Sequence, residues 1–306
     1  MLTQITTVKG RRAHVERHLT KWMESGIDEL VLVDYACPQE TAKHVLKSEF
    51  ARDPRITLVL VPERVQVKTN VFNVAAGSFN LSRARNIGAM VARHQGFLFL
   101  DADCWVAPEF VRHIKERLDG VTDNDDVMDF GKILEYDLIL SGKHVLDQGK
   151  HLAGMPQTWV PDGQCAIRSS LFHRVHGYND MNWNWGAESY DLYIRCAAVE
   201  KARIDYFGTQ EIRNLPHNDE LRCTFLSSPF GTIATETRAE RFADSYRQLR
   251  TQRTGLKFEK EGPVEGTAVT LTRASPGRPL GLPEKLMQCI PVIRGGRQDV
   301  WRGGHD

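Results

Sequence analysis

The chain has 306 residues, of which 41% are hydrophobic, so it can bury the core of one large α/β domain with or without an appendage. Its formal net charge of +1 argues against a protein that grips nucleic acid through bulk electrostatics. Because the sequence contains no run of about 18 apolar residues and no apolar stretch at its N-terminus, we expect no membrane span, no secretion signal and a cytoplasmic location, with peripheral membrane association still compatible.

The first third of the chain alternates short apolar segments with segments of helical periodicity. This alternation predicts an α/β fold built on an open, mostly parallel sheet flanked by helices. Ligands of such sheets collect beyond the carboxyl ends of the strands. The predicted strands are 3–8, 29–34, 56–61 and 97–100, and the predicted helices are 12–25, 40–50 and 82–94.

The rest of the chain is less regular. A strand at 163–167, a helix at 169–175 and a helix from 186 to about 199 are predicted, while 141–163 shows no periodicity and suggests a lid, a binding loop or disorder. A mixed-charge helix at 236–251 and a Pro/Gly-rich tail from 262 complete the chain.

The apolar run Phe97 to Leu100 ends in two carboxylates, Asp101 and Asp103. In an extended segment, residues two apart project to the same side, so both carboxylates can converge on one hard divalent cation. Their oxygens suit magnesium or manganese and the phosphates that such ions carry. An Asx turn after a strand, with Asp103 capping the next element, is the alternative interpretation.

Four motifs occur in a particular order: Asp34 after the second strand, 82–88 (Ser-Arg-Ala-Arg-Asn-Ile-Gly), 101–103 (Asp-Ala-Asp) and 185–192 (Trp-Gly-Ala-Glu-Ser-Tyr-Asp-Leu). With them the chain resembles nucleotide-sugar-dependent glycosyltransferases of the GT-A (Rossmann-like) fold. The resemblance is to the large family 2 and, in the C-terminal half, to β-1,4-galactosyltransferases and chondroitin polymerases. It covers roughly residues 3 to 220.

The resemblance implies a domain organisation and a substrate class. A nucleotide-sugar-binding half is expected at 1–104 and an acceptor-binding half at 105–225, followed by a helical and Pro/Gly-rich extension at 226–306. The implied reaction is metal-dependent transfer of a hexosyl or N-acetylhexosaminyl group, from a UDP-sugar by preference, to a hydroxyl of a glycan or small-molecule acceptor. Polysaccharide biosynthesis is the implied context, and no nucleic acid partner is expected.

The family's donor site can be carried over onto five residues of this sequence. Thr7, Lys9 and Arg11, after the first strand, resemble the segment that lines the nucleoside pocket. Asp34 resembles the carboxylate that reads the base or ribose, and Arg85 belongs to the motif that flanks the donor. Each of the charged residues has a structural alternative. Lys9 and Arg11 are then solvated residues before a helix, Asp34 is a turn former or helix cap, and Arg85 lies on the polar face of an amphipathic helix.

The resemblance also implies a manganese or magnesium ion. Asp103 would ligate the ion directly, Asp101 would bind the ribose or a metal-bound water, and His217 would be the third protein ligand. A solvated or hydrogen-bonded histidine is the alternative for His217. Trp185 suits a face on which a sugar ring stacks, or plain core packing.

The catalytic base is the point at which the sequence departs from the family. The usual Glu-Asp motif reads Glu188-Ser189 here, so the base role falls to Glu188 or Asp191, which are neighbours on one helical face. We favour inversion, with a retaining mechanism like that of polypeptide N-acetylgalactosaminyltransferases and a catalytically inactive sugar-binding relative as alternatives. A nucleotidyltransferase would need a glycine-rich loop that residues 7–12 lack.

Overall fold

The computed structural model describes the following residues: 1–62, 79–120, 127–130, 133–134, 164–178, 188–189, 192, 196, 204–207, 212–215, 258–261, 268–271 and 287–299. Four predicted features lie outside them: the 141–163 loop, the 236–251 helix, most of the 186–199 helix, and the boundary at 225.

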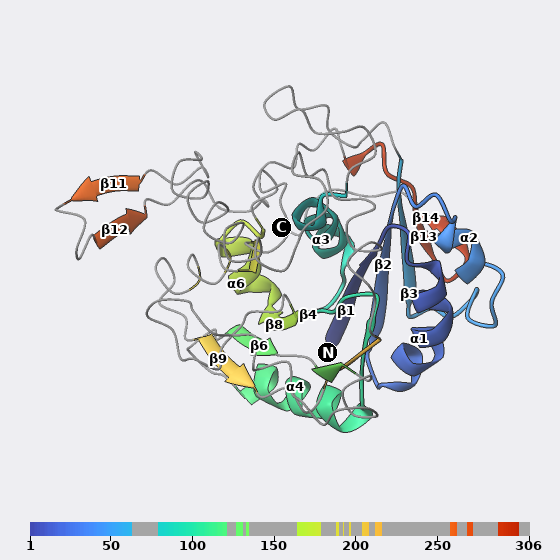
Figure 1. Cartoon of the computed structure of the whole chain (residues 1–306), viewed down its shortest axis with the longest axis horizontal. Helices are drawn as coiled ribbons and strands as arrows, with labels where there is room; N and C mark the ends of the chain where they lie inside the picture. Colours follow the sequence, from blue (N-terminus) through green and yellow to red (C-terminus); the bar gives the residue numbers. More distant parts are fainter. Residues whose placement is uncertain are drawn as a thin grey trace.

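A parallel sheet forms the centre of the molecule, as predicted (Figure 1). Its strands lie in the order β3-β2-β1-β4, and each runs parallel to its neighbours. Runs of β-branched and leucine side chains, buried on both faces, explain why these segments form central strands. Their bounds are β1 (Leu2–Val8), β2 (Glu29–Tyr35), β3 (Ile56–Val61) and β4 (Gly96–Phe99).

Antiparallel strands extend the sheet at both edges; the sequence analysis predicted the first of them, at 163–167, as a strand but predicted neither its direction nor the others. Beyond β4, the strand β8 (Gln164–Arg168) runs antiparallel, followed by β6 (Val127–Phe130) and β9 (Ile204–Phe207). Beyond β3 lies a hairpin of β13 (Val292–Arg294) and β14 (Arg297–Asp299). Part of the segment assigned to an extension therefore belongs to the main sheet.

Within the part of the chain that the structure describes, five strands lie outside the main sheet. A three-stranded sheet has the order β5-β10-β7, and β11 pairs with β12. Within the small sheet, β10 runs antiparallel to β5 and parallel to β7. The bounds are β5 (Cys104–Val106), β7 (Ile133–Leu134), β10 (Ile212–Asn214), β11 (Phe258–Glu261) and β12 (Ala268–Leu271).

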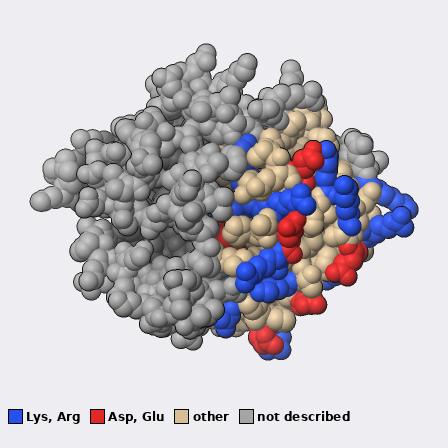
Figure 2. All heavy atoms as spheres, turned by 45° about the vertical axis from the view of Figure 1, so that its right-hand side comes forward, with Lys and Arg blue, Asp and Glu red and all other residues tan. Residues whose placement is uncertain are grey.

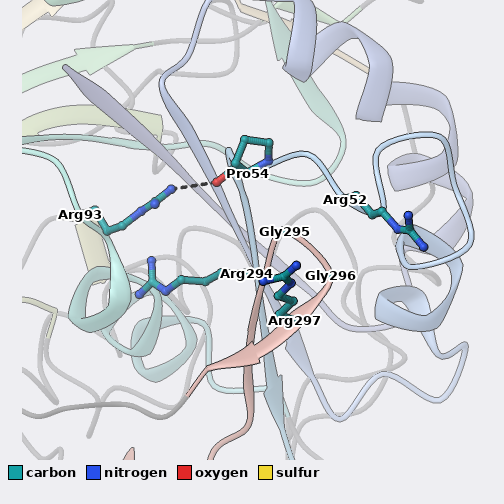
Figure 3. Close-up of a pocket in the computed structure, with 7 residues that line it drawn as sticks. All are labelled: Arg52, Pro54, Arg93, Arg294, Gly295, Gly296 and Arg297. Carbon is teal, nitrogen blue, oxygen red and sulfur yellow. Dashed lines mark hydrogen bonds between the residues drawn. The ribbon is translucent and has the colours of Figure 1, made fainter.

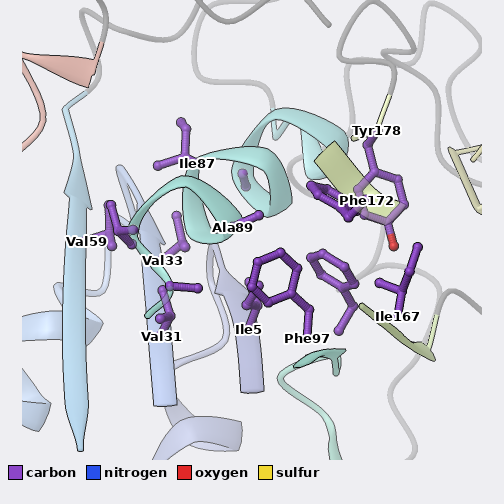
Figure 4. Packing of buried hydrophobic residues seen from close by; sticks show 14 of the residues in the cluster. Ile5, Val31, Val33, Val59, Ile87, Ala89, Phe97, Ile167, Phe172 and Tyr178 are labelled. Atoms are coloured by element: carbon purple, nitrogen blue, oxygen red, sulfur yellow. The ribbon is translucent and has the colours of Figure 1, made fainter. Parts of the chain in front are cut away.

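Helices cover both faces of the sheet. The apolar side chains of α1 (Arg12–Glu24), α2 (Thr41–Val45) and α4 (Pro108–Gly120) share one core cluster with the sheet, and those of α3 (Leu81–Val91) and α6 (Ser169–Arg174) share the other. Figure 4 shows the second cluster, in which α3 lies over side chains of the first three strands.

Helix α3 approaches the sheet unusually closely. A Cβ atom added at Gly88 would lie 2.5 Å from Cγ2 of Ile5 and 3.1 Å from Cγ2 of Val33, so glycine is required for this contact. Its N-terminus is capped by the Asn80 side chain, which accepts a hydrogen bond from the Arg83 N–H at 2.8 Å. The helix is therefore fixed both along the sheet and at its start, where the next side chains form the site.

Two helices end earlier than predicted. Helix α2 ends at Val45 rather than near residue 50. Just beyond it, the Ser48 hydroxyl donates to the Val45 carbonyl at 2.7 Å, a side-chain bond that competes with continuation of the helix. Helix α3 ends at Val91 rather than at residue 94, because the Arg93 N–H bonds to the carboxylate of Glu29 at 2.8 Å instead of to a helical carbonyl.

Among the described residues, no helix has the length and apolar character needed to cross a membrane. Basic and acidic side chains alternate over the face of the molecule on the α1 and α2 side (Figure 2). This mixture accords with the net charge of +1.

Candidate active site

The carboxyl ends of β1, β2 and β4 meet at one edge of the sheet, because these strands are parallel. Val8 pairs with Asp34 in the register of β1 and β2, and Asp101 follows β4 by two residues. Predicted site residues from three separate segments therefore lie along the same edge of the fold.

The Asp101 carboxylate is held on both oxygens. Arg85 donates from Nη2 to Oδ1 at 3.0 Å, and Gln164 donates from Nε2 to Oδ2 at 2.6 Å. The Asp101 N–H in turn donates to Oε1 of Gln164 at 2.8 Å. These bonds fix the carboxylate from two directions and occupy about half of its acceptor sites.

Arg85 is the centre of this cluster. Its side chain is 3% exposed, with Nη1 at 3.7 Å from Oε1 of Glu188 and its guanidinium 5.2 Å from the ring centre of Tyr178. Burial alone would lower the pKa of Arg85, but the carboxylates of Asp101 and Glu188 among other groups outweigh burial and raise it. The alternative in which Arg85 is simply a residue on the polar face of an amphipathic helix is wrong, because its side chain is buried among charged and aromatic partners.

The motif at 185–192 is partly described. Glu188, Ser189, Leu192 and Cys196 are helical and buried, which agrees with one face of the predicted helix packing inward. The Ser189 hydroxyl oxygen is buried and has no hydrogen-bond partner among the described residues. Asp191 and Trp185 lie outside the described residues.

Asp103 lies where two segments distant in sequence meet. Its side chain is buried, with Oδ1 at 3.5 Å from Sγ of Cys104. Its backbone carbonyl accepts from the Leu215 N–H at 2.7 Å, next to the pairing of β5 with β10. No cluster of three His, Cys, Asp or Glu side chains occurs in the described part of the chain, and His217 lies outside that part.

Lys9 joins the ends of the first two strands. It is buried, and its Nζ donates to the carbonyls of Tyr35 at 3.2 Å and Ala36 at 3.4 Å. The alternative of a solvated lysine is therefore wrong. Thr7 is also buried, whereas Arg11 is only half-buried, and its carbonyl accepts the first backbone bonds of α1.

Asp34 has a structural role in the turn after β2. Oδ1 accepts from the Cys37 N–H and Oδ2 from the Ala42 N–H, both at 2.8 Å, so the carboxylate fixes the turn and the start of α2. Burial raises the pKa of Asp34, although these two bonds and the charge of Lys9 oppose the shift. Asp34 therefore makes the contacts expected of a turn former.

Sequence reasoning missed three residues of the cluster. Gln164 orients Asp101, Tyr178 stacks on Arg85, and Asn86 fixes Tyr178 through two backbone bonds, at 2.7 Å to its carbonyl and 2.8 Å from its N–H. Burial raises the pKa of Tyr178 well above its usual value, so the phenol stays neutral. These contacts join segments that are distant in sequence. The antiparallel pairing of β8 with β4 brings Gln164 to Asp101, and no local sequence pattern predicts that pairing.

Two family models match the chain. The model described as glycosyl transferase family 2 matches residues 19–130, and the model described as the N-terminal domain of galactosyltransferase matches residues 157–218. No curated protein sequence matches.

Solved structures share the fold. S. aureus TarS 1-349 in complex with UDP-GlcNAc is 15% identical, with a TM-score of 0.54 over 82% of this chain and 65% of that chain. This chain therefore spans less than two thirds of that TarS chain. Glucosyl-3-phosphoglycerate synthase from Mycobacterium tuberculosis, in complex with Mn2+, UDP and phosphoglyceric acid, is 13% identical, with a TM-score of 0.52 over 91% of this chain and 89% of that chain.

The sheet order and the fold shared with the two solved structures show that this chain has the GT-A fold. The two family matches follow each other along the chain in the order of the motifs, and both models describe glycosyltransferases. The protein has the GT-A fold; residues 19–130 are similar to family 2 glycosyltransferases and residues 157–218 to galactosyltransferases.

Proposed function

We propose that this protein transfers a sugar from a UDP-sugar to a hydroxyl group of a glycan or small-molecule acceptor, with a divalent metal ion and with inversion at the sugar carbon. The observation that carries the proposal is the buried Arg85, which joins Asp101 at the end of β4 to Glu188 in the catalytic motif. The two fold relatives support the donor class, since one was solved with UDP-GlcNAc and the other with Mn2+ and UDP.

The donor set at the sheet edge fits a hard cation. Asp103 contributes a carboxylate on a backbone held by Leu215, and carboxylate oxygens suit manganese and magnesium. Leu215 precedes His217 by two residues, and two residues span up to about 7 Å, so the chain can bring this imidazole to Asp103. Asp103 and His217 would hold the ion, with Asp101 contacting it through water or binding the ribose. The ion would offset the charge that develops on the departing diphosphate.

We assign the nucleoside to the ends of β1 and β2. Thr7, Lys9 and Arg11 lie there with Asp34, and the contacts of Lys9 and Asp34 with backbone groups hold the two strand ends in a fixed arrangement. Arg85 would keep the Asp101 carboxylate oriented while the donor binds. Rigid support of this kind favours binding because less freedom is lost when the ligand arrives.

The base is one of two carboxylates in the catalytic motif. Glu188 faces Arg85, so its charge is already used to neutralise a buried cation. We therefore assign Glu188 to positioning Arg85, and Asp191 to taking the proton from the acceptor hydroxyl. Trp185, just before this helix, would offer its ring to the sugar.

The experiment is a screen of UDP-hexoses and UDP-N-acetylhexosamines for hydrolysis and transfer with and without manganese. Asp103→Ala should abolish turnover and weaken donor binding, and His217→Ala should do so less severely. Asp119→Ala, at an exposed aspartate of α4, is the control and should behave as wild type. Full activity of Asp103→Ala, or activity that survives exhaustive chelation, would refute the metal-dependent mechanism.

The anomeric configuration of the product, read by NMR, tests inversion separately. A product with the configuration of the donor would establish a retaining enzyme and would remove the need for a base. An absence of turnover with every donor, together with retained UDP-sugar binding, would instead identify a sugar-binding relative.

A further inference from the structure

A second candidate site lies at the opposite edge of the sheet. A pocket of about 700 Å³ opens beyond the amino ends of the strands and is lined by Arg52, Pro54, Arg93, Arg294, Gly295, Gly296 and Arg297 (Figure 3). Arg294 pairs with Thr57 near the start of β3, whereas the candidate active site follows the carboxyl ends. The pocket therefore plays no part in the donor site described above.

Two of its four arginines are fixed by one buried carboxylate. Glu29, which is fully buried, accepts from Nε of Arg93 at 2.8 Å and from Nη1 of Arg294 at 3.3 Å. The same guanidinium groups donate to the carbonyls of Pro54 at 3.1 Å and Val91 at 2.9 Å. Their side chains nevertheless remain 43% and 24% exposed, so they can still contact a ligand.

The other two arginines carry charge that no described residue neutralises. Arg52 and Arg297 are exposed and make no ion pair within the described ranges. Nearby Asp53 is paired with Arg55 at 2.7 Å. The four positive charges of the pocket, less the one negative charge of Glu29, leave a local excess of three in a chain with a net charge of +1.

The turn between β13 and β14 is built to bring these arginines together. Gly295 and Gly296 have φ angles of +50° and +76°, which a residue with a Cβ atom adopts only with strain. A Cβ atom at Gly296 would lie 2.7 Å from the Ala51 carbonyl oxygen, and the Gly295 N–H donates to the Ile56 carbonyl at 3.1 Å. The two glycines thus hold the hairpin turn against the segment that carries Arg52.

We propose that this pocket binds a phosphate or diphosphate group of a ligand other than the sugar donor. Planar guanidinium groups match phosphate oxygens in paired hydrogen bonds, and several arginines around one pocket favour an anion with at least two charges. The volume leaves room for a ligand larger than the phosphate itself. The group belongs either to a soluble phosphorylated compound or to the headgroup of an anionic phospholipid.

The test uses the full chain with pyrophosphate as the probe, in EDTA to weaken binding at the donor site, by isothermal titration calorimetry. The double variant Arg52→Gln, Arg297→Gln should bind pyrophosphate about tenfold more weakly or worse, because charge-assisted hydrogen bonds are lost. Arg112→Gln, at an exposed arginine of α4, should bind as wild type does. Should the double variant fail to fold, each single variant is expected to weaken binding several-fold.

A second arm distinguishes the two sources of phosphate. Sedimentation with vesicles of phosphatidylglycerol, compared with phosphatidylcholine, should retain wild type and lose the double variant if the ligand is a headgroup. Binding of pyrophosphate without retention by vesicles assigns the site to a soluble phosphorylated compound. Equal affinity of wild type and double variant in both arms, or no binding of wild type to either probe, would overturn the proposal. Neither result bears on glycosyl transfer.

Discussion

Replacing Arg85 by methionine tests whether the cluster at the sheet edge is a coupled, buried unit. Methionine keeps much of the packing volume against Tyr178 but removes the charge that lies 3.0 Å from Asp101 and 3.7 Å from Glu188. Breaking a buried ion pair from one side costs about 3 to 5 kcal/mol, because uncompensated charges stay buried. That is a large part of the roughly 5 to 15 kcal/mol by which folded proteins are stable.

The matched control is Arg12→Met. Arg12 pairs with Glu16 at 2.7 Å, but both side chains are exposed, at 48% and 38%, one helical turn apart. Such pairs contribute about 0.3 to 0.5 kcal/mol. The contrast between the two substitutions should therefore be about tenfold in free energy for the same change in side chain.

Urea denaturation followed by tryptophan fluorescence gives the free energy of unfolding. With a slope of about 3 kcal/mol per molar urea, the Arg85 variant should unfold at about 1 to 2 M less urea than wild type, and the control within about 0.2 M. UDP affinity should fall in the Arg85 variant alone, since Asp101 loses the donor to Oδ1. A loss below about 1 kcal/mol with unchanged UDP affinity would show that the cluster is not a coupled unit.

Three further outcomes are expected. Gln164→Leu removes the two hydrogen bonds between Gln164 and Asp101, which leaves polar groups unpaired at a cost of about 1 to 3 kcal/mol each. UDP binding, measured by titration, should weaken, and an unchanged affinity would contradict the role of Gln164. Asp191→Asn should lower kcat by about 10² to 10⁴ with an unchanged donor KM, whereas Glu188→Gln should also raise that KM; the reverse pattern in steady-state kinetics would exchange the two roles. Because the pKa of Asp34 is raised, the folded state binds its proton more tightly, so this group favours folding at low pH and opposes it as the pH rises through the raised pKa. The stability of wild type relative to Asp34→Asn in urea should therefore decrease as the pH rises from about 4 to 7, and a flat or rising difference would contradict the shift.

Much of the fold could be predicted because its signals are local. The strands β2, β3 and β4 are mostly apolar runs, and α1 carries Val15, Leu19 and Trp22 on one face, so these elements show local signals of their own. Among the described strands beyond this parallel core, β8 was predicted from its sequence, but its antiparallel direction and the other strands were not. β13 has three residues, and it joins the main sheet through its pairing with β3, more than 200 residues away.

The candidate site shows the same difference between local and long-range signals. Asp34, Asp101 and Arg85 were named because they stand at strand ends or in a motif, and all three are described at or near the carboxyl edge. The meaning of their contacts was not visible. The burial of Arg85 among Asp101, Glu188 and Tyr178 depends on segments that are distant in sequence, and Gln164 of β8 bonds to Asp101 from the other side.

Arg85 therefore links parts of the chain that fold from different local signals. It starts from α3, binds the residue that follows β4, and faces Glu188 in the second family match. Gln164, at the start of β8, closes the same cluster from the antiparallel side. Residues of both matched regions therefore meet at the Asp101 carboxylate and at the guanidinium that holds it. If the donor binds at this edge as we propose, the order of its site should depend on the segment that carries the proposed catalytic carboxylates, and truncating that segment's contact with Arg85 should disturb Asp101 as well.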